Sequence, residues 1–187
     1  MTTSDTKIMI PAWVEGKLTP VEKLEAHVLG LRHKAISVFV MDGDDLLIQR
    51  RAMGKYHTPG LWANTCCTHP YWGENALDCA CRRLNEELGI TGLQLDARDR
   101  IEYRADVPTR DGAPALVEHE LVDIFVAEAA RDRFQIRPNP DEVMDYRWIS
   151  RATLTAEIAE TPDQFTPWLR IYLTEHSDQI FERTVAA

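Results

Sequence analysis

The chain has 187 residues, of which 44% are hydrophobic and 27% are charged, a composition typical of one globular domain with its own core. Its formal net charge of −9 argues against general binding to nucleic acid or to an anionic membrane surface. The first residues lack the apolar segment of a secretion signal, and no apolar run is long enough to span a bilayer. We therefore expect a cytoplasmic protein whose four cysteines are reduced.

The first predicted strand is the β-branched and aromatic run 35–41, which turn residues separate from a second strand at 46–50. A proline–glycine pair at 59–60 precedes a short extended segment that ends near His69. Apolar residues then recur with helical spacing from about Asn75, and Gly89 stands where a helix C-terminal glycine belongs. Three further strands are predicted at 93–103, 117–128 and 143–149.

The end of the chain is predicted to be helical. Ser150 can cap a short helix, and Thr166 with Pro167 is typical of a second helix start. We expect that second helix over about 167–187 and an N-terminal lead-in over about 1–20. Strands in the middle of the chain with helices around them predict a layered α/β (α+β) fold, with one domain over 1–187.

The most informative segment places Cys67 two residues before His69. Residues i and i+2 of an extended segment project to the same face, so the thiol and the imidazole can share one pocket. The predicted helix that follows carries Arg83 and Glu87 four residues apart, on one stripe. Together these groups indicate acid–base chemistry on an anionic, phosphorylated compound. Taken alone, Cys67 is equally well explained as a buried structural thiol.

Glu118 and Glu120 alternate inside an otherwise apolar predicted strand, so both side chains point the same way. On a solvated face they would be ordinary surface charges. On a buried face, two adjacent carboxylates need a cation or a shared proton. A metal ion would therefore make the pair physically reasonable.

Histidines could complete such a metal site, and the candidates are His27, His33 and His69. Imidazoles together with carboxylate oxygens suit Mn²⁺, Zn²⁺ or Mg²⁺. We leave out His57 and also His119, because His119 should face away from the glutamates on either side of it.

A basic cluster is the candidate for binding a diphosphate. It comprises Arg50, Arg51 and Lys55, with Lys23 upstream and Arg83 on the predicted helix. Arginine binds phosphate oxygens in a bidentate manner, and lysine binds them as a point charge. Without the other features, the same charges would simply be a solvated edge.

These residues and their order resemble the type I isopentenyl-diphosphate isomerases, which have a Nudix-like fold with a mixed β-sheet packed between helices. The resemblance extends from about residue 23 to residue 168. The matching elements are Gln49-Arg50-Arg51, Lys55, Pro59-Gly60, Trp62, Asn64, Cys67, His69-Pro70, Gly73-Glu74, Arg82-Arg83, Glu87-Leu88-Gly89, Tyr103-Arg104-Ala105, Glu118, Glu120, Asp141-Glu142-Val143, Phe165 and Pro167-Trp168.

The resemblance implies catalytic roles for four side chains. Cys67 and Glu120 would act on opposite faces of the substrate, and Tyr103 would assist Glu120 through a hydrogen bond. Trp168 would face a cationic intermediate. Either Cys67 or Glu120 could be the proton donor, because the implied reaction is reversible.

The resemblance also implies two kinds of metal and a substrate clamp. One divalent ion (Mn²⁺, Zn²⁺ or Mg²⁺) would be bound by His27, His33, His69, Glu118 and Glu120. A second ion, Mg²⁺, would be held by Glu87 and would bridge to the diphosphate. The clamp on the diphosphate would consist of Lys23, Arg51, Lys55 and Arg83.

The implied activity is the conversion of isopentenyl diphosphate to dimethylallyl diphosphate, an isomerase step of isoprenoid biosynthesis. The alternative is a Nudix diphosphate hydrolase, because Glu74, Arg82, Glu86, Glu87 and Gly89 fit that family's box. However, Thr68 replaces an expected glycine, and Arg83 replaces an expected metal-binding glutamate. A further alternative is a catalytically inactive module that senses a diphosphate, which would have no need of Cys67, Glu118 and Glu120 together.

Overall fold

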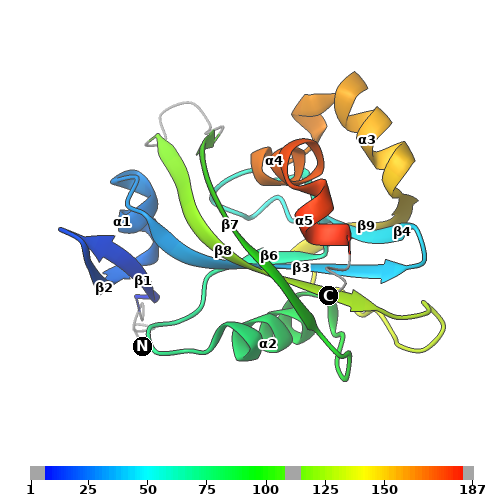
Figure 1. Cartoon of the computed structure of the whole chain (residues 1–187), viewed down its shortest axis with the longest axis horizontal. Helices are drawn as coiled ribbons and strands as arrows, with labels where there is room; N and C mark the ends of the chain where they lie inside the picture. The colour runs from blue at the N-terminus through cyan, green and yellow to red at the C-terminus, as the bar shows by residue number, and fades with distance from the viewer. Residues whose placement is uncertain (1–6, 108–114, 183–187) are drawn as a thin grey trace, which may run out of the picture.

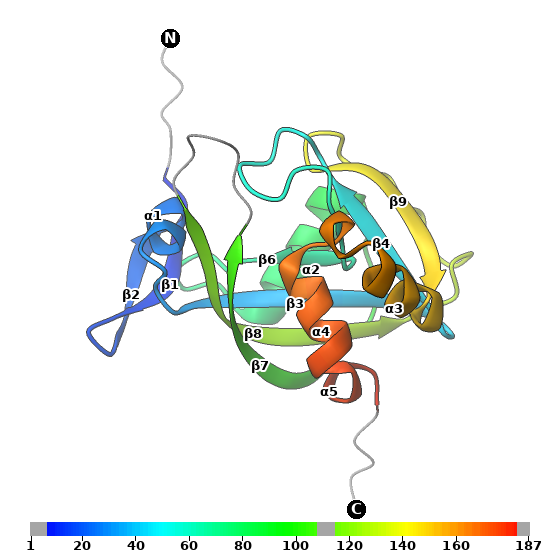
Figure 2. The same ribbon diagram turned by 90° about the horizontal axis from the view of Figure 1, so that it is seen from above.

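The computed structural model describes residues 7–107 and 115–182. In the described part, a nine-stranded sheet lies between helices (Figures 1 and 2), so the predicted mixed sheet packed between helices is confirmed. The strands are β1 (Met9–Val14), β2 (Lys17–Glu22), β3 (His33–Asp42), β4 (Asp45–Arg51), β5 (Trp62–Ala63), β6 (Cys66–Thr68), β7 (Asp96–Val107), β8 (Leu116–Glu128) and β9 (Val143–Ser150). The helices are α1 (Lys23–Val28), α2 (Ala76–Leu88), α3 (Arg151–Glu160), the 3-10 turn η1 (Pro162–Gln164), α4 (Pro167–Glu175) and α5 (Ser177–Phe181).

Strand β3 organises the sheet. One of its edges pairs with β8 in parallel, and its other edge pairs in turn with β1, β6 and β4, all antiparallel. Helices cover both faces of β3, which explains why 35–41 is a nearly continuous apolar run rather than an alternating one. The register places His33 beside Glu120 and Ser37 beside Cys67, so β3 brings the two predicted catalytic segments together.

The two faces of β3 bury different partners. Ile36 and Val38 pack beneath α2, against Leu84. The alternate residues of β3 face the other way: Phe39 packs beneath α4 against Tyr172, with ring centroids 5.8 Å apart. Figure 1 shows α2 on one side of the sheet and α4 and α5 on the other. The predicted helical spacing after Asn75 therefore corresponds to the core-facing stripe of α2.

The two ends of the chain differ from expectation. Residues expected to be a lead-in form the β1–β2 hairpin, closed by Glu15 and Gly16 with φ of 50° and 78°, the left-handed conformations that a tight hairpin turn uses. The C-terminal helix expected over 167–187 is interrupted at His176, whose φ of −128° is not helical. It continues as α5 only to Phe181, and residues 183–187 lie outside the described residues.

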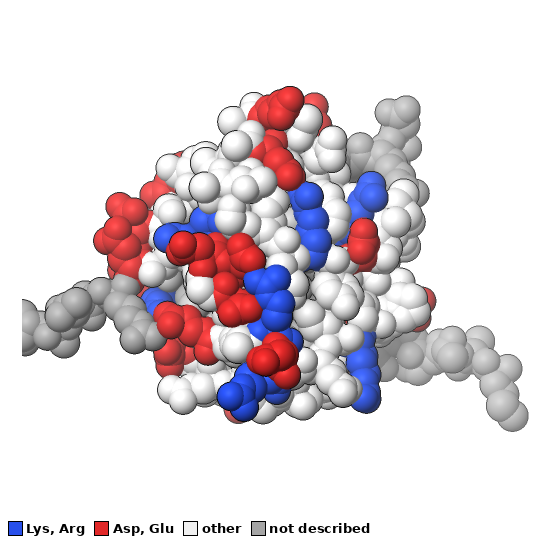
Figure 3. Space-filling model, turned by 90° about the vertical axis from the view of Figure 1, so that its right-hand side faces the viewer, with Lys and Arg blue, Asp and Glu red and all other residues white. Residues whose placement is uncertain are grey.

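Charge on the surface is dispersed. On the face in Figure 3, Lys and Arg side chains lie next to Asp and Glu, with broad uncharged areas between them. Such mixing gives local ion pairs, as between Arg131 and Asp42, whose Nε and Oδ2 are 2.6 Å apart. None of the described helices is long and apolar enough to cross a membrane.

Candidate active site and metal centre

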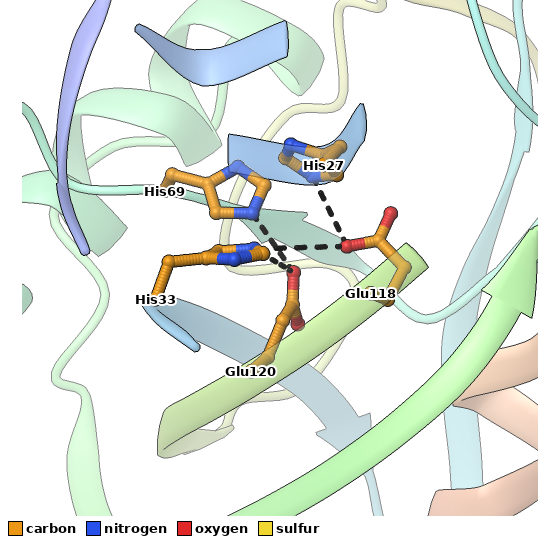
Figure 4. A group of neighbouring side chains, drawn as sticks. All are labelled: His27, His33, His69, Glu118 and Glu120. Atoms are coloured by element: carbon orange, nitrogen blue, oxygen red, sulfur yellow. Dashed lines mark hydrogen bonds and ion pairs between the residues drawn. The ribbon is translucent and has the colours of Figure 1, made fainter. Parts of the chain in front are cut away.

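Five metal-ligating side chains converge at one end of the sheet (Figure 4). One potential ligand atom from each lies within 4.8 Å of all the others, and all five side chains are buried. They are the predicted set: His27, His33, His69, Glu118 and Glu120.

Four elements position this cluster. Strand alternation along β8 aims Glu118 and Glu120 to the same side. His33 opens β3 and is paired with Glu120 in the parallel register. His27 comes from α1, and His69 directly follows β6.

Backbone carbonyls fix the orientation of two of the histidines. The Nδ1 atom of His27 lies 2.6 Å from the Lys23 carbonyl oxygen, and that of His33 lies 2.7 Å from the Leu31 carbonyl oxygen. A ring nitrogen that donates to a carbonyl leaves the other nitrogen as a lone-pair donor, which is the usual arrangement of a metal-bound histidine. In both residues the free Nε2 faces the carboxylates.

The cluster fits a divalent cation. Nε2 of His27, Nε2 of His33 and Oε2 of Glu118 are buried and make no hydrogen bond within the described residues, although His27 Nε2 and Glu118 Oε2 are only 3.2 Å apart. Buried polar atoms are nearly always satisfied. Three imidazoles and two carboxylates converge here, and only His69 and Glu120 form a hydrogen bond with each other, at 2.8 Å. The unsatisfied atoms and the donor set are those of a metal centre.

His57 belongs to the site although we left it out of the predicted set. Its Nε2 is 2.8 Å from Oε1 of Glu118, and the residue is 6% exposed. It lies in the loop between β4 and β5, where no periodicity reports which way a side chain points. His119, by contrast, faces away from both glutamates as expected, with its Nε2 3.6 Å from Glu102.

The environments of the two carboxyl groups shift their pKa values in opposite directions. Burial opposes ionisation of Glu118, but its close contacts with His27 and His57 outweigh burial and hold the Glu118 pKa well below its usual value. Burial, followed by the negative charge of Glu118, raises the pKa of Glu120 to about 7. Glu118 is therefore the permanent charge of the pair, and Glu120 is the group able to carry a proton near neutral pH.

Tyr103 contacts Glu120 from the neighbouring strand β7. Its hydroxyl donates to Glu120 Oε2 at 2.7 Å, and the two residues are paired across β7 and β8. Burial and the charge of Glu120 raise the Tyr103 pKa well above its ordinary value, so the phenol keeps its proton and remains a donor.

Cys67 lies on β6 and lines the same cavity as Glu120. Burial, and next the charge of Glu120, raise the pKa of its thiol well above the usual range. The thiol and the carboxyl are therefore electrostatically coupled, because protonation of Glu120 removes the charge that disfavours the Cys67 thiolate. Cys66 and Cys79 are buried free thiols, and Cys81 is an exposed one.

Trp168 forms an aromatic wall of the cavity. It is 2% exposed, and the Arg51 guanidinium lies 5.3 Å from the centre of its ring. The ring also lies 5.9 Å from that of His57. An indole face so placed can stabilise positive charge without offering a nucleophile.

Four cations line the cavity: Lys23, Arg51, Lys55 and Arg83. Burial lowers the Lys23 pKa to about 8, with further contributions from the positive charges of Lys55 and Arg83. Arg50 does not join them, because its side chain is exposed and its Nε donates to the Gly60 carbonyl at 2.9 Å.

Acidic residues orient two of these cations. Glu142 pairs with Lys55, and its Oε2 lies 3.3 Å from Arg83 Nη2. The same Arg83 nitrogen is 2.6 Å from Oε1 of Glu87, whose other oxygen accepts from Gln49 at 2.7 Å. We had assigned no role to Glu142 or Gln49, since neither contact can be read from sequence spacing.

Almost all the predicted site residues lie around one cavity. Its lining includes Lys23, Arg51, Lys55, Cys67, His69, Arg83, Glu87, Glu118, Glu120 and Trp168. The remaining three lie directly behind it, with His27 and His33 in the five-residue cluster and Tyr103 on Glu120.

This fold and this site have known relatives. A NUDIX domain matches residues 31–169. The fold resembles that of DR0079 from Deinococcus radiodurans, with a TM-score of 0.67 at 14% identity, over 88% of this chain and 96% of that one. It also resembles a MutT NUDIX hydrolase from Burkholderia pseudomallei, with a TM-score of 0.55 at 20% identity, over 76% of this chain and 95% of that one. The sheet, the helices and the acidic site thus define a protein of the NUDIX class.

Sequence relatives narrow the class. An isopentenyl-diphosphate Delta-isomerase of Cereibacter sphaeroides is 65% identical over 173 residues, covering 92% of this chain and 94% of the relative. Proteins of the same name from Dinoroseobacter shibae and Rhodobacter capsulatus are 60% and 57% identical, over 94% and 95% of this chain and 96% and 98% of the relatives. The chain belongs to the isopentenyl-diphosphate Delta-isomerase family.

Proposed function

We propose that this chain converts isopentenyl diphosphate to dimethylallyl diphosphate by adding a proton to one carbon of the alkene and removing a proton from another. The product would supply isoprenoid biosynthesis. The observation that carries the proposal is the shared cavity, which Cys67 and Glu120 line together with four cations.

The diphosphate binds to the four cations and takes no part in the bond changes. Lys23, Arg51, Lys55 and Arg83 grip its oxygens, and Glu87 would offer a carboxylate to a Mg²⁺ ion that binds together with the diphosphate. Charge–charge contacts at this end supply the binding energy that places the apolar end of the substrate between Cys67 and Glu120.

In the first step Glu120 acts as the acid. Its protonated carboxyl delivers a proton to the terminal methylene carbon, the alkene electron pair forms the new C–H bond, and a tertiary cation remains at the neighbouring carbon. A pKa near 7 means that a protonated Glu120 is present at neutral pH. Tyr103 holds the carboxyl by its hydrogen bond to Oε2.

In the second step Cys67 acts as the base. Its thiolate removes a proton from the carbon adjacent to the cation on the diphosphate side, and the electrons of that C–H bond form the new double bond. The negative charge of Glu120 disfavours the thiolate, so the state with the proton on Glu120 is also the state that best supports a thiolate at Cys67.

A tertiary cation must be protected from water, which would trap it as an alcohol. The face of Trp168, which is 2% exposed, covers the cavity with a π-system that stabilises positive charge, by about 2 kcal/mol where water is excluded.

We assign the five-residue cluster to one divalent cation, Mn²⁺, Zn²⁺ or Mg²⁺. When bound, such an ion would hold both carboxylates in place and make the Glu120 proton more acidic. The protein contributes the remaining geometry through the carbonyls that orient His27 and His33.

The alternative activity, Nudix diphosphate hydrolysis, agrees less well with the residues of the Nudix box. Hydrolysis requires metal-binding carboxylates around Mg²⁺, whereas here Arg83 occupies one such position. Its Nη2 lies 2.6 Å from Glu87, so an arginine takes the place of one of the carboxylate ligands that hydrolysis needs around its metal ions.

Turnover in ²H₂O distinguishes the candidates. With isopentenyl diphosphate, Mg²⁺ and Mn²⁺, the isomerase produces dimethylallyl diphosphate with deuterium in a methyl group, detected by NMR. A hydrolase instead releases phosphate from nucleoside diphosphate derivatives, and a sensing module does neither. Absence of deuterated product together with phosphate release would refute the proposed function.

A further inference from the structure

Two buried hydroxyl groups lie behind the proposed catalytic pair. Ser37 on β3 and Tyr172 on α4 are both fully buried, and Ser37 Oγ is 3.1 Å from Tyr172 Oη. These residues are 135 positions apart in the chain. Hydroxyls are costly to bury where an apolar side chain would fit, so a pair joined across a sheet–helix interface suggests a role beyond packing.

The pair extends toward both catalytic groups. Ser37 stands directly opposite Cys67 across β3 and β6, so the two side chains project to the same face and the Ser37 hydroxyl lies next to the Cys67 side chain. In the other direction the Tyr172 ring packs edge-on against the Tyr103 ring, with ring centroids 5.7 Å apart. Tyr103 in turn donates to Glu120 at 2.7 Å.

Asn64 anchors the serine. Its Nδ2 lies 3.3 Å from Ser37 Oγ and also donates to the carbonyls of Val38 and Cys66, each at 3.0 Å. Because Asn64 supplies the hydrogen at Ser37 Oγ, the serine's own proton is directed to Tyr172 Oη. The same amide nitrogen thus links the serine oxygen to the backbones of β3 and β6, which fixes the position of the serine hydroxyl.

We propose that Ser37 and Tyr172 are positioning residues that hold the Cys67 sulfur in its orientation toward the substrate. This inference rests on the proposed function and deepens it. A cysteine side chain on a strand can occupy several staggered χ1 states, and the strand alone does not select one. The Ser37 hydroxyl selects the state that faces the cavity, and the Tyr172 hydroxyl keeps Ser37 in place.

Orientation matters most for the second proton transfer. Once the cation has formed, it either loses a proton to Cys67 and becomes product, or returns a proton to Glu120 and becomes substrate again. A sulfur displaced by about an ångström loses its near-attack geometry. Return to substrate then becomes more frequent, although formation of the cation is unaffected.

Ser37→Ala and Tyr172→Phe test this, because each removes one hydroxyl and retains most of the packing. In ²H₂O we expect kcat to fall on the order of tenfold, about the value of one hydrogen bond, with KM for isopentenyl diphosphate unchanged. We also expect the recovered substrate to carry more deuterium at its terminal methylene, per molecule of product, than with the wild-type protein. Ile180→Val is the matched control, since it removes one methyl group from the same core cluster and no polar atom.

The outcomes separate the inference from the function on which it rests. Wild-type turnover establishes the function independently of the variants. An unchanged kcat in both variants would overturn the inference, and so would a parallel decline of product and deuterium exchange, because misorientation of Cys67 must raise the ratio of exchange to product. If Ser37→Ala fails to fold, Tyr172→Phe retains the aromatic ring and decides the question alone.

Discussion

At the scale of single residues, the site contains two carboxyl groups whose environments shift their pKa values in opposite directions. Glu118 is held ionised by two histidines, whereas burial and that charge raise the pKa of its neighbour Glu120 to about 7. Two identical side chains on one strand are thus divided into a fixed charge and a proton carrier. The sulfur of Cys67 completes the pair of groups that an alkene proton transfer requires.

Cys67→Ala and Glu120→Gln should each lower kcat by at least about 10³-fold, the upper part of the range for a positioned acid or base. Both variants should retain the wild-type circular dichroism spectrum, because each change is nearly isosteric. Cys81→Ala is the control for thiol removal, since Cys81 is exposed and distant from the cavity. Near-native rates in either main variant would remove that residue from the catalytic pair.

His57 should support the metal centre without being part of it. Its imidazole bonds Glu118 Oε1 at 2.8 Å, and loss of such a supporting contact typically costs 10- to 100-fold in metal affinity. We expect His57→Ala to weaken Mn²⁺ binding by about that factor in competition titrations, and His33→Ala to weaken it much more. His119 lies on β8 and faces away from Glu118 and Glu120, so His119→Ala should leave Mn²⁺ affinity unchanged. Equal losses of affinity in the His57 and His119 variants would contradict the assignment.

Lys23 should make diphosphate binding dependent on pH. Its pKa is lowered to about 8, so the ammonium is present at pH 7 and is largely lost by pH 9. The dissociation constant for inorganic diphosphate, measured by calorimetry with Mg²⁺, should therefore rise by up to about tenfold over that range. Lys23→Arg keeps its charge and should show a much flatter profile; the same steep profile in this variant would exclude Lys23 as the cause.

At the scale of secondary-structure elements, α2 and the segment after β8 jointly hold the anion-binding end of the site. Gly89 ends α2 with φ of +64°, and the carbonyls of Leu88 and Glu87 just before it accept hydrogen bonds from the amides of Arg137 and Asn139. A Cβ at this position would lie 2.9 Å from the backbone oxygen of Arg137. Glycine is therefore required both for backbone conformation and for close approach.

Gly89→Ala should lower the free energy of unfolding by about 2–3 kcal/mol, through backbone strain together with displacement of the neighbouring segment. Gly92→Ala is the control, because Gly92 also has a positive φ, of 75°, but open space where the methyl would lie. That variant should lose only about 1 kcal/mol. Urea denaturation measures both, and equal losses would show that the contact with Arg137 does not matter.

Elements with strong periodicity were predictable, and those defined by tertiary contacts were not. The apolar run of β3, the stripe of α2 and the alternation in β8 each follow from burial on a known face. The hairpin β1–β2 was missed, because the middle of β1 is buried and β2 is mostly exposed, so that neither strand has a clear alternating pattern. The break at His176 was also missed, since nothing in the local sequence prevents the helix from continuing there.

The site itself was predictable to the extent that its residues lie in such elements. Glu118 and Glu120 could be placed on one face from strand alternation alone. His57, Glu142 and Ser37 could not, because their roles depend on which loops and strands meet in three dimensions. His57 lies in a loop, and Ser37 is one polar residue in an apolar strand, a pattern that equally fits ordinary core packing.

At the scale of the whole molecule, the metal centre joins α1, β3, β8 and the end of β6. These elements are remote in sequence, so an ion bound to all of them also stabilises the fold. An ion at 100 times its dissociation constant contributes about 3 kcal/mol to the free energy of unfolding. In a chain of this size that corresponds to about 5–10 °C in Tm.

Chelation should therefore lower Tm by about that amount and abolish turnover, and Mn²⁺ should restore both. Calorimetric scans with and without EDTA measure the shift. The variant Glu118→Gln provides the comparison, since without the carboxylate its Tm should respond little to EDTA. A wild-type Tm indifferent to chelation would indicate that no ion occupies the His/Glu cluster.

The most direct test of the whole account is a crystal structure of the protein with Mn²⁺, Mg²⁺ and an unreactive analogue of isopentenyl diphosphate. Anomalous scattering should locate an ion bound by the three histidines and two glutamates. The hydrocarbon end of the analogue should lie between the sulfur of Cys67 and the carboxyl of Glu120, one on each face. An analogue that leaves both groups on the same side, or that binds outside this cavity, would contradict the mechanism.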